Sequence, residues 1–111
     1  LTIIMNVLSI GGSDPSSGAG IQSDVKTFEN HGVYGFTVIT AITSQNTKKI
    51  SKIVPISPKN IESQLESVLS DFQIDAIKFS LISRISSSLM PNHRAGSSVL
   101  MILALITTQA S

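Results

Sequence analysis

The chain has 111 residues, of which 41% are hydrophobic and 14% charged, and this composition is typical of a globular protein. Its formal net charge of +1 gives no reason to expect a nucleic acid or an anionic membrane as a partner. With no cysteine there are no disulfides and no thiolate metal site, and a cytoplasmic location is the natural expectation. The longest apolar run, 99–106, is far shorter than the ~20 residues that cross a bilayer.

The first part of the chain predicts a strand, a tight loop and a helix. Ile3–Ile10 is an apolar run that indicates a buried strand. Glycine, serine and aspartate fill the loop that follows. Ile21, Val25 and Phe28 then recur at helical spacing, which favours a helix from about Ala19 to His31.

The next part predicts two strands, a helix and a last strand. The expected elements are a strand 34–42, a polar loop 43–49, a strand 50–56, a helix 58–72 and a strand 74–79. Pro55 favours an edge position for the third strand, because proline cannot donate to a neighbouring strand. Ser57 and Pro58 have the residue types of an N-cap and a first helical position.

This alternation predicts an α/β fold in which helices pack on a mostly parallel sheet. In such sheets, ligands bind beyond the carboxyl ends of the strands, beside the N-termini of helices. The loop after the first strand, 11–20, is therefore a candidate binding site. Asp14, which precedes Pro15, is expected to organise the turn through its side-chain oxygen. The loop matches neither the phosphate-binding P-loop nor the dinucleotide-binding glycine pattern, so on its own a structural turn is the better interpretation.

Four linked blocks resemble one family. They are GSDPSSGAGIQSDVKTF at 12–28, GVYG at 32–35, VITA at 38–41 and QNT at 45–47. Together they resemble the N-terminal part of the hydroxymethylpyrimidine/phosphomethylpyrimidine kinases, which make the pyrimidine half of thiamin. The resemblance implies a ribokinase-like three-layer α/β/α fold, with 1–79 as the N-terminal part of the kinase domain.

The resemblance also implies three substrate-binding residues. The backbone near Gly12 is expected to border the pyrimidine pocket, and Asp24 to accept a hydrogen bond from the exocyclic amine of the substrate. Gln45 is expected to read the ring, because a carboxamide offers one donor and one acceptor to a 4-aminopyrimidine. Without the resemblance, Asp24 is a favourable charge near a helix start and Gln45 an ordinary loop residue.

The segment 80–111 does not follow the family pattern. It has no acidic residue, so residues 1–75 carry a charge of −2 and residues 76–111 a charge of +3. This shift favours a tail that arose from a changed reading frame or a truncated gene, with a diverged native strand and helix as the alternative. The Gly-Thr-Gly-Cys/Asp segment that holds the family's phosphates and base is missing, and we find no catalytic residue and no metal ligands.

The implied reaction is phosphorylation of an aminopyrimidine by ATP with Mg²⁺, and the expectation for this chain is an incomplete and inactive version. A small-molecule partner is expected, and a homodimer is compatible with the sequence. Two other functions stay open. One is a kinase acting on pyridoxal or pyridoxine, for which Gln45 and Asp24 are less suited, and the other is a non-catalytic pyrimidine-binding fragment. A product without a stable fold is a further alternative, because part of a sheet exposes an edge.

Overall fold

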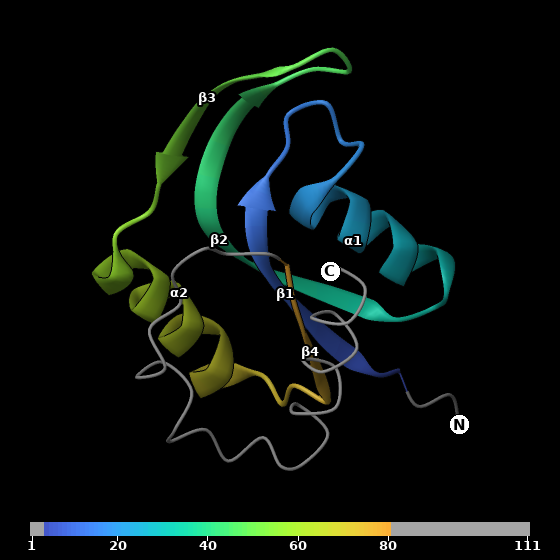
Figure 1. Ribbon diagram of the computed structural model, residues 1–111. Coiled ribbons are helices and arrows are strands. Elements are labelled where there is room, and N and C mark those ends of the chain that lie inside the picture. Colours follow the sequence, from blue (N-terminus) through green and yellow to red (C-terminus); the bar gives the residue numbers. More distant parts are fainter. Residues whose placement is uncertain (1–3, 81–111) are drawn as a thin grey trace.

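The computed structural model describes residues 4–80 of the chain. The elements follow the predicted order: β1 (Asn6–Ser13), α1 (Gly20–Asn30), β2 (Tyr34–Gln45), β3 (Ile50–Pro55), α2 (Pro58–Asp71) and β4 (Ala76–Phe79). Figure 1 shows the strands as one curved sheet, with the two helices lying on opposite sides of it. The predicted tail 80–111 lies outside the described residues except for Ser80.

The sheet has the strand order β3-β2-β1-β4. β1 pairs in parallel with β2 and with β4, whereas β3 runs antiparallel to β2 at the edge. The predicted mostly parallel sheet is confirmed, and so is the edge position of the strand that contains Pro55. A parallel β1–β2 pair places the ends of both strands, and the loops that follow them, at one edge of the sheet.

One face of the sheet is the hydrophobic core, and α2 covers it. Leu8 and Val38 are completely buried, and Ile10, Ile77 and Phe79 lie close to them. A stripe on α2 packs on this face, and it consists of Ile61, Leu65, Val68 and Leu69. Ser57 caps the helix, since its Oγ accepts from the Asn60 amide at 3.2 Å. The spacing of apolar residues predicted both the helix and its buried face.

The opposite face, under α1, is more polar and has smaller residues. Ser9, on β1, is fully buried and donates to Asp24 of α1. Gly35, on β2, leaves room for the ring of Phe28, because a Cβ there would come within 2.9 Å of it. α1 therefore sits close to the sheet, and the sheet is sandwiched between two helical layers as the sequence predicted.

The structure corrects two predicted boundaries. β1 does not end at Ile10 but continues through Gly11 and Gly12 to Ser13, since pairing with β2 holds the glycines extended. β2 does not end at Ile42 either. It continues to Gln45 because β3 pairs with it up to that residue, so the predicted polar loop is reduced to a turn between Gln45 and Ile50. No helix within residues 4–80 is long and apolar enough to cross a membrane.

Candidate functional site

The loop between β1 and α1 is organised by Asp14, as its position before a proline predicted. The Asp14 side chain is 3% exposed. Its Oδ1 accepts from the backbone amide and the hydroxyl of Ser16, at 2.8 and 2.6 Å. Its Oδ2 accepts from the Ala19 amide at 2.8 Å. The carboxylate thus accepts three hydrogen bonds from donors of the loop itself.

These hydrogen bonds lower the pKa of the Asp14 carboxyl below its usual range, and the one from the Ser16 side chain has the largest effect. Because the pKa is lower in the folded state, the ionised carboxylate stabilises the fold at every pH above the unfolded-state pKa. That stabilisation is lost as the pH falls through the lower, folded-state value.

We expect Asp14→Asn to be less stable than the unmodified chain at neutral pH and to lose less stability on acidification below about pH 4. An asparagine cannot accept hydrogen bonds on both terminal atoms, so one side of the loop is released. Urea unfolding at a series of pH values measures this, with the exposed Asp71→Asn as the control. Parallel stability–pH curves for the Asp14→Asn variant and the unmodified chain would contradict the assignment.

The start of α1 is held against the end of β1 by two further residues. Gly20 has a φ of +64°, and a Cβ there would collide with the Gly12 carbonyl oxygen, so only glycine fits. The Gln22 carboxamide accepts from the Asp14 amide at 2.8 Å and donates to Ser13 Oγ at 2.7 Å. The loop is therefore a rigid connection between β1 and α1.

The β2–β3 hairpin reaches beyond β1 and lies beside this loop (Figure 1). The hydroxyl of Thr43 donates to the Ser13 carbonyl at 2.8 Å, and Gln45 Oε1 lies 3.3 Å from the same hydroxyl. A hydroxyl has one proton, and the shorter contact takes it. The half-buried carboxamide of Gln45 is thus held near the end of β1 with weak internal hydrogen bonding, and it is available to a ligand.

Gly12 lies at the same end of the β1–β2 pair, opposite Ala41. Unlike Gly20, it does not need to be glycine for packing within the described residues. A Cβ at Gly12 would meet only the Ala41 carbonyl oxygen, at an ordinary contact distance of 3.8 Å. The missing side chain therefore leaves space beside the strand end, where a flat ring can approach the backbone.

Asp24 is placed differently from Gly12 and Gln45. Its side chain is 9% exposed and faces the sheet, where Oδ2 accepts from Ser9 Oγ at 2.6 Å and Oδ1 accepts from Lys78 Nζ. Ser9 and Lys78 are paired neighbours on β1 and β4. Both oxygens thus have a partner within the chain, and the helix-dipole interpretation is not supported, since the first turn of α1 has no acidic residue.

The structure therefore places Gly12 and Gln45 at the end of the β1–β2 pair, and Asp24 further back. Asp24 lies at the level of Ser9, which pairs with Thr37 of β2. Gln45 lies eight residues further along the same strand, and because the strand curves (Figure 1) the contour length of about 25 Å is an upper limit to that separation. The substrate role of Asp24 stays a prediction. Each of its oxygens accepts one hydrogen bond from the chain and keeps a second lone pair, so a contact with the substrate does not require the loss of Ser9 or Lys78.

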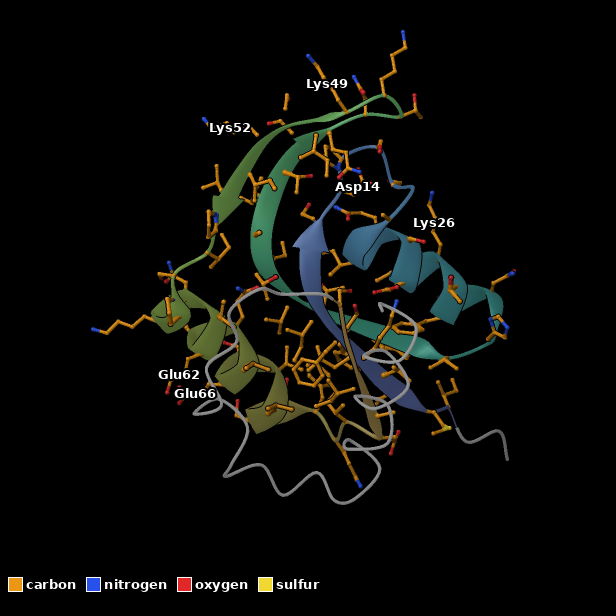
Figure 2. The ribbon with its side chains drawn as sticks, in the orientation of Figure 1. Asp14, Lys26, Lys49, Lys52, Glu62 and Glu66 are labelled. Carbon is orange, nitrogen blue, oxygen red and sulfur yellow. The ribbon has the colours of Figure 1, made fainter. Side chains whose placement is uncertain are left out.

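The described residues contain no cluster of metal-binding side chains. Within 4–80, no three side chains of histidine, cysteine, aspartate or glutamate lie close enough together to hold a metal ion. The two carboxylates nearest the strand ends are Asp14 and Asp24, and both are paired as described. Lys49 and Lys52, on the hairpin, point away from the molecule in Figure 2, which favours a solvated edge over a phosphate site.

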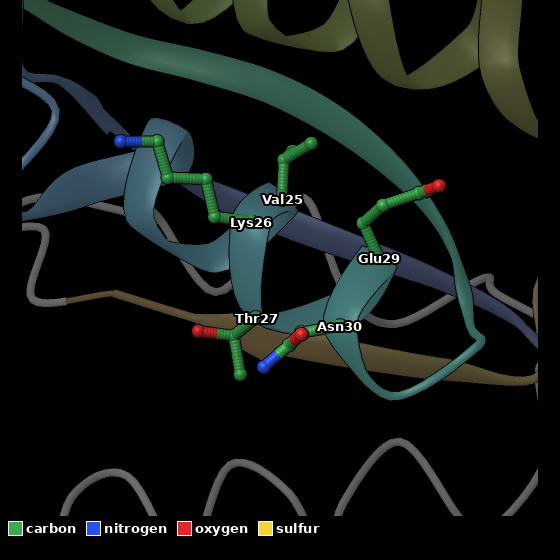
Figure 3. Close-up of a pocket in the computed structure, with 5 residues that line it drawn as sticks. All are labelled: Val25, Lys26, Thr27, Glu29 and Asn30. Atoms are coloured by element: carbon green, nitrogen blue, oxygen red, sulfur yellow. The ribbon is translucent and has the colours of Figure 1, made fainter.

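A hollow lies beside α1 (Figure 3). The residues that line it include Val25, Lys26, Thr27, Glu29 and Asn30. It is open to solvent, and neither Gly12 nor Gln45 belongs to these five residues. It is therefore not the site that the sequence predicted.

Three side chains that join neighbouring elements were not predicted from the sequence: Gln22, Gln64 and Lys78. Gln64 lies on α2, and its Oε1 and Nε2 bind the amide and carbonyl of Ile39, each at 2.8 Å. Lys78 interrupts the apolar run of β4, and a lysine in a buried strand is a usable signal of a partner carboxylate. No local pattern identifies the partners of the two glutamines, because those contacts depend on the fold.

Comparison with known proteins identifies the family. The family model for phosphomethylpyrimidine kinase matches residues 14–92. The hydroxymethylpyrimidine/phosphomethylpyrimidine kinases of Rhizobium meliloti (strain 1021) and Escherichia coli (strain K12) are 48% and 47% identical to this chain, over 69% and 70% of its length. The chain spans only 29% of either relative. The family model extends past residue 79, where the resemblance was expected to end, and that boundary stays a prediction.

Solved structures agree with this assignment. A crystal structure of phosphomethylpyrimidine kinase from Clostridium difficile 630 matches with a TM-score of 0.68 and 46% identity, over 70% of this chain and 34% of that one. A pyridoxal kinase from Staphylococcus aureus, in complex with pyridoxal, matches with a TM-score of 0.67 and 38% identity, over 75% and 31% of the two chains. These neighbours have the ribokinase-like fold that the resemblance implied. This chain therefore belongs to the phosphomethylpyrimidine kinase family.

Proposed function

We propose that this chain carries the aminopyrimidine-binding part of a hydroxymethylpyrimidine/phosphomethylpyrimidine kinase. The whole enzyme would transfer a phosphoryl group from ATP to 4-amino-5-hydroxymethyl-2-methylpyrimidine and to its monophosphate. The observation that carries the proposal is the Gln45 carboxamide, held beside the end of β1 by the Thr43–Ser13 hydrogen bond. One edge of that carboxamide matches the ring nitrogen and amine of a 4-aminopyrimidine.

In this proposal Gly12 and Gln45 have different roles in binding the substrate. Gly12 leaves the backbone accessible to the flat ring, and Gln45 selects the amine-bearing edge of the ring. Asp24 retains the direct contact with the amine that the resemblance implies, through a lone pair that neither Ser9 nor Lys78 uses. ATP and Mg²⁺ would be bound by other residues than those described, and binding of substrate is therefore the activity proposed for residues 4–80. We further propose a cytoplasmic location and a homodimer, in which the exposed Ile50 and Ile53 of β3 would be covered.

A second candidate function is favoured by the pyridoxal kinase neighbours, which share this fold at similar TM-scores. Pyridoxal has a ring nitrogen but no exocyclic amine beside it, so it would use only half of the Gln45 carboxamide. The sequence identity is also lower for that neighbour, at 38% against 46% for the phosphomethylpyrimidine kinase. We therefore propose an aminopyrimidine, ahead of pyridoxal, as the ligand of this site.

Isothermal titration of the full chain with hydroxymethylpyrimidine and with pyridoxal tests this order. We expect the aminopyrimidine to bind at least tenfold more tightly, because a site that offers an acceptor to an amine is left unpaired by a ligand lacking it. Tighter binding of pyridoxal would instead support the second candidate. A coupled ATPase assay on the same sample decides between a kinase and a binding fragment.

A further inference from the structure

β2 contains one extra residue at the level where it passes the glycines of β1. Gly11 pairs with Ile39 and Gly12 with Ala41, so Thr40 is left without a partner on β1. Such a bulge bends a strand and increases its twist, and it reverses which residues face each side beyond it. Gln45 lies beyond the bulge, so the bulge decides the side of the hairpin on which the Gln45 carboxamide is presented.

At this bulge, backbone groups point away from β1 and need other partners. The pairing with β3 begins only at Ala41 and does not reach Ile39. The Thr40 carbonyl accepts from the Ile56 amide at 2.8 Å. On the side that faces away from β1, the backbone groups of Ile39 pair with neither β1 nor β3. The Gln64 carboxamide from α2 fills the gap, and it binds both the amide and the carbonyl of Ile39 at 2.8 Å.

We propose that Gln64 is a positioning residue, which holds the β2 bulge and so fixes the face and the place of Gln45. A carboxamide is the side chain that can offer a strand edge a donor and an acceptor together. Without the Gln64 carboxamide, the amide and the carbonyl of Ile39 lose their hydrogen-bond partner. Restoring a regular pairing would then shift Thr43 and Gln45 to the other face. The proposal rests on the proposed function in one respect only, which is the expectation that loss of the Gln64 carboxamide weakens ligand binding.

The first test does not use a ligand. Amide hydrogen exchange in the full chain is compared for Gln64→Met, which keeps the size of the side chain, and for the exposed Ser63→Ala on the same helix. We expect the amides of Ile39 and of residues 41–45 to lose at least tenfold in protection in Gln64→Met only, while those of Leu8 and Ile77 keep theirs. Unchanged protection, or an equal loss throughout the core, would overturn the proposal.

A second variant tests the role of the carboxamide rather than the general stability of the fold. In Gln64→Glu, an ionised carboxylate can accept from the Ile39 amide but cannot donate to its carbonyl. A protonated carboxyl group can do both. Protection factors of the hairpin amides should therefore rise on acidification in this variant and not in Gln64→Met. The same pH response in both variants would count against the role.

The ligand arm separates this proposal from the proposed function. If hydroxymethylpyrimidine binds the unmodified chain, Gln64→Met should raise its Kd about tenfold and Ser63→Ala should not. An unchanged Kd would show that Gln64 does not position Gln45. If the unmodified chain binds no aminopyrimidine, the proposed function fails, and the exchange experiment alone decides whether Gln64 holds the bulge.

Discussion

Replacing Gln45 with leucine is expected to weaken the binding of hydroxymethylpyrimidine by about 10- to 100-fold. A bidentate carboxamide–base contact contributes about 1–3 kcal/mol of discrimination. Leucine keeps roughly the same volume and removes both hydrogen bonds. Within residues 4–80, the one hydrogen-bond contact of the Gln45 side chain is with the Thr43 hydroxyl at 3.3 Å, so the fold should be little affected by the change.

Titration calorimetry measures this loss, and thermal unfolding checks that the variant is folded. Gln73→Leu is the matched control, because the side chain of Gln73 is exposed and lies at the opposite end of the sheet, where its backbone carbonyl accepts from Asn6. The assignment would be contradicted if both leucine variants bound the aminopyrimidine as the unmodified chain does.

Replacing Lys78 with methionine is expected to cost more stability than replacing Asp24 with asparagine. Without Lys78, the Asp24 side chain, which is 9% exposed in the unmodified chain, keeps Ser9 as its remaining partner. Removing one partner of a buried pair costs about 3–5 kcal/mol, and we expect about 2–3 because the Lys78 side chain is 36% exposed. In Asp24→Asn, the amide oxygen can still accept a hydrogen bond, and the loss should be about 1 kcal/mol.

Urea unfolding at neutral pH measures these differences, with the exposed Lys26→Met on α1 as the control. Equal costs for the Lys78 and Lys26 variants would contradict a structural ion pair. Binding by the same variants tests the role of Asp24. If Asp24 contacts the substrate amine, Asp24→Asn should weaken binding far more than Lys78→Met. If Asp24 only fixes α1 on the sheet, the two variants should weaken binding to a similar degree.

The sequence predicted most of the fold because its elements have strong local signals. The apolar stripe from Ile61 to Leu69 and the Ser57–Pro58 start fixed α2, and Pro55 marked the edge strand. The extension of β1 through two glycines had no local signal, since glycine favours turns and only pairing with β2 keeps it extended. For the same reason, the extension of β2 to Gln45 depended on β3.

The candidate site was predicted less completely than the fold. Asp14 was correctly assigned to the loop, because an aspartate before proline commonly binds nearby amides. The substrate role of Asp24 stays a prediction, but its two internal partners, Ser9 and Lys78, were not predicted. Those partners come from positions 15 and 54 residues away, beyond the range of any sequence pattern. The contact between Gln64 and the β2 bulge is long-range in the same sense.

The most direct test of the aminopyrimidine site is a titration of the ¹⁵N-labelled full chain with hydroxymethylpyrimidine, followed by NMR. We predict that the side-chain NH₂ signals of Gln45 and the backbone amide of Gly12 shift together and saturate at the same ligand concentration. Shifts confined to the hollow beside Lys26 and Asn30, or no saturable shift at Gln45, would contradict the account.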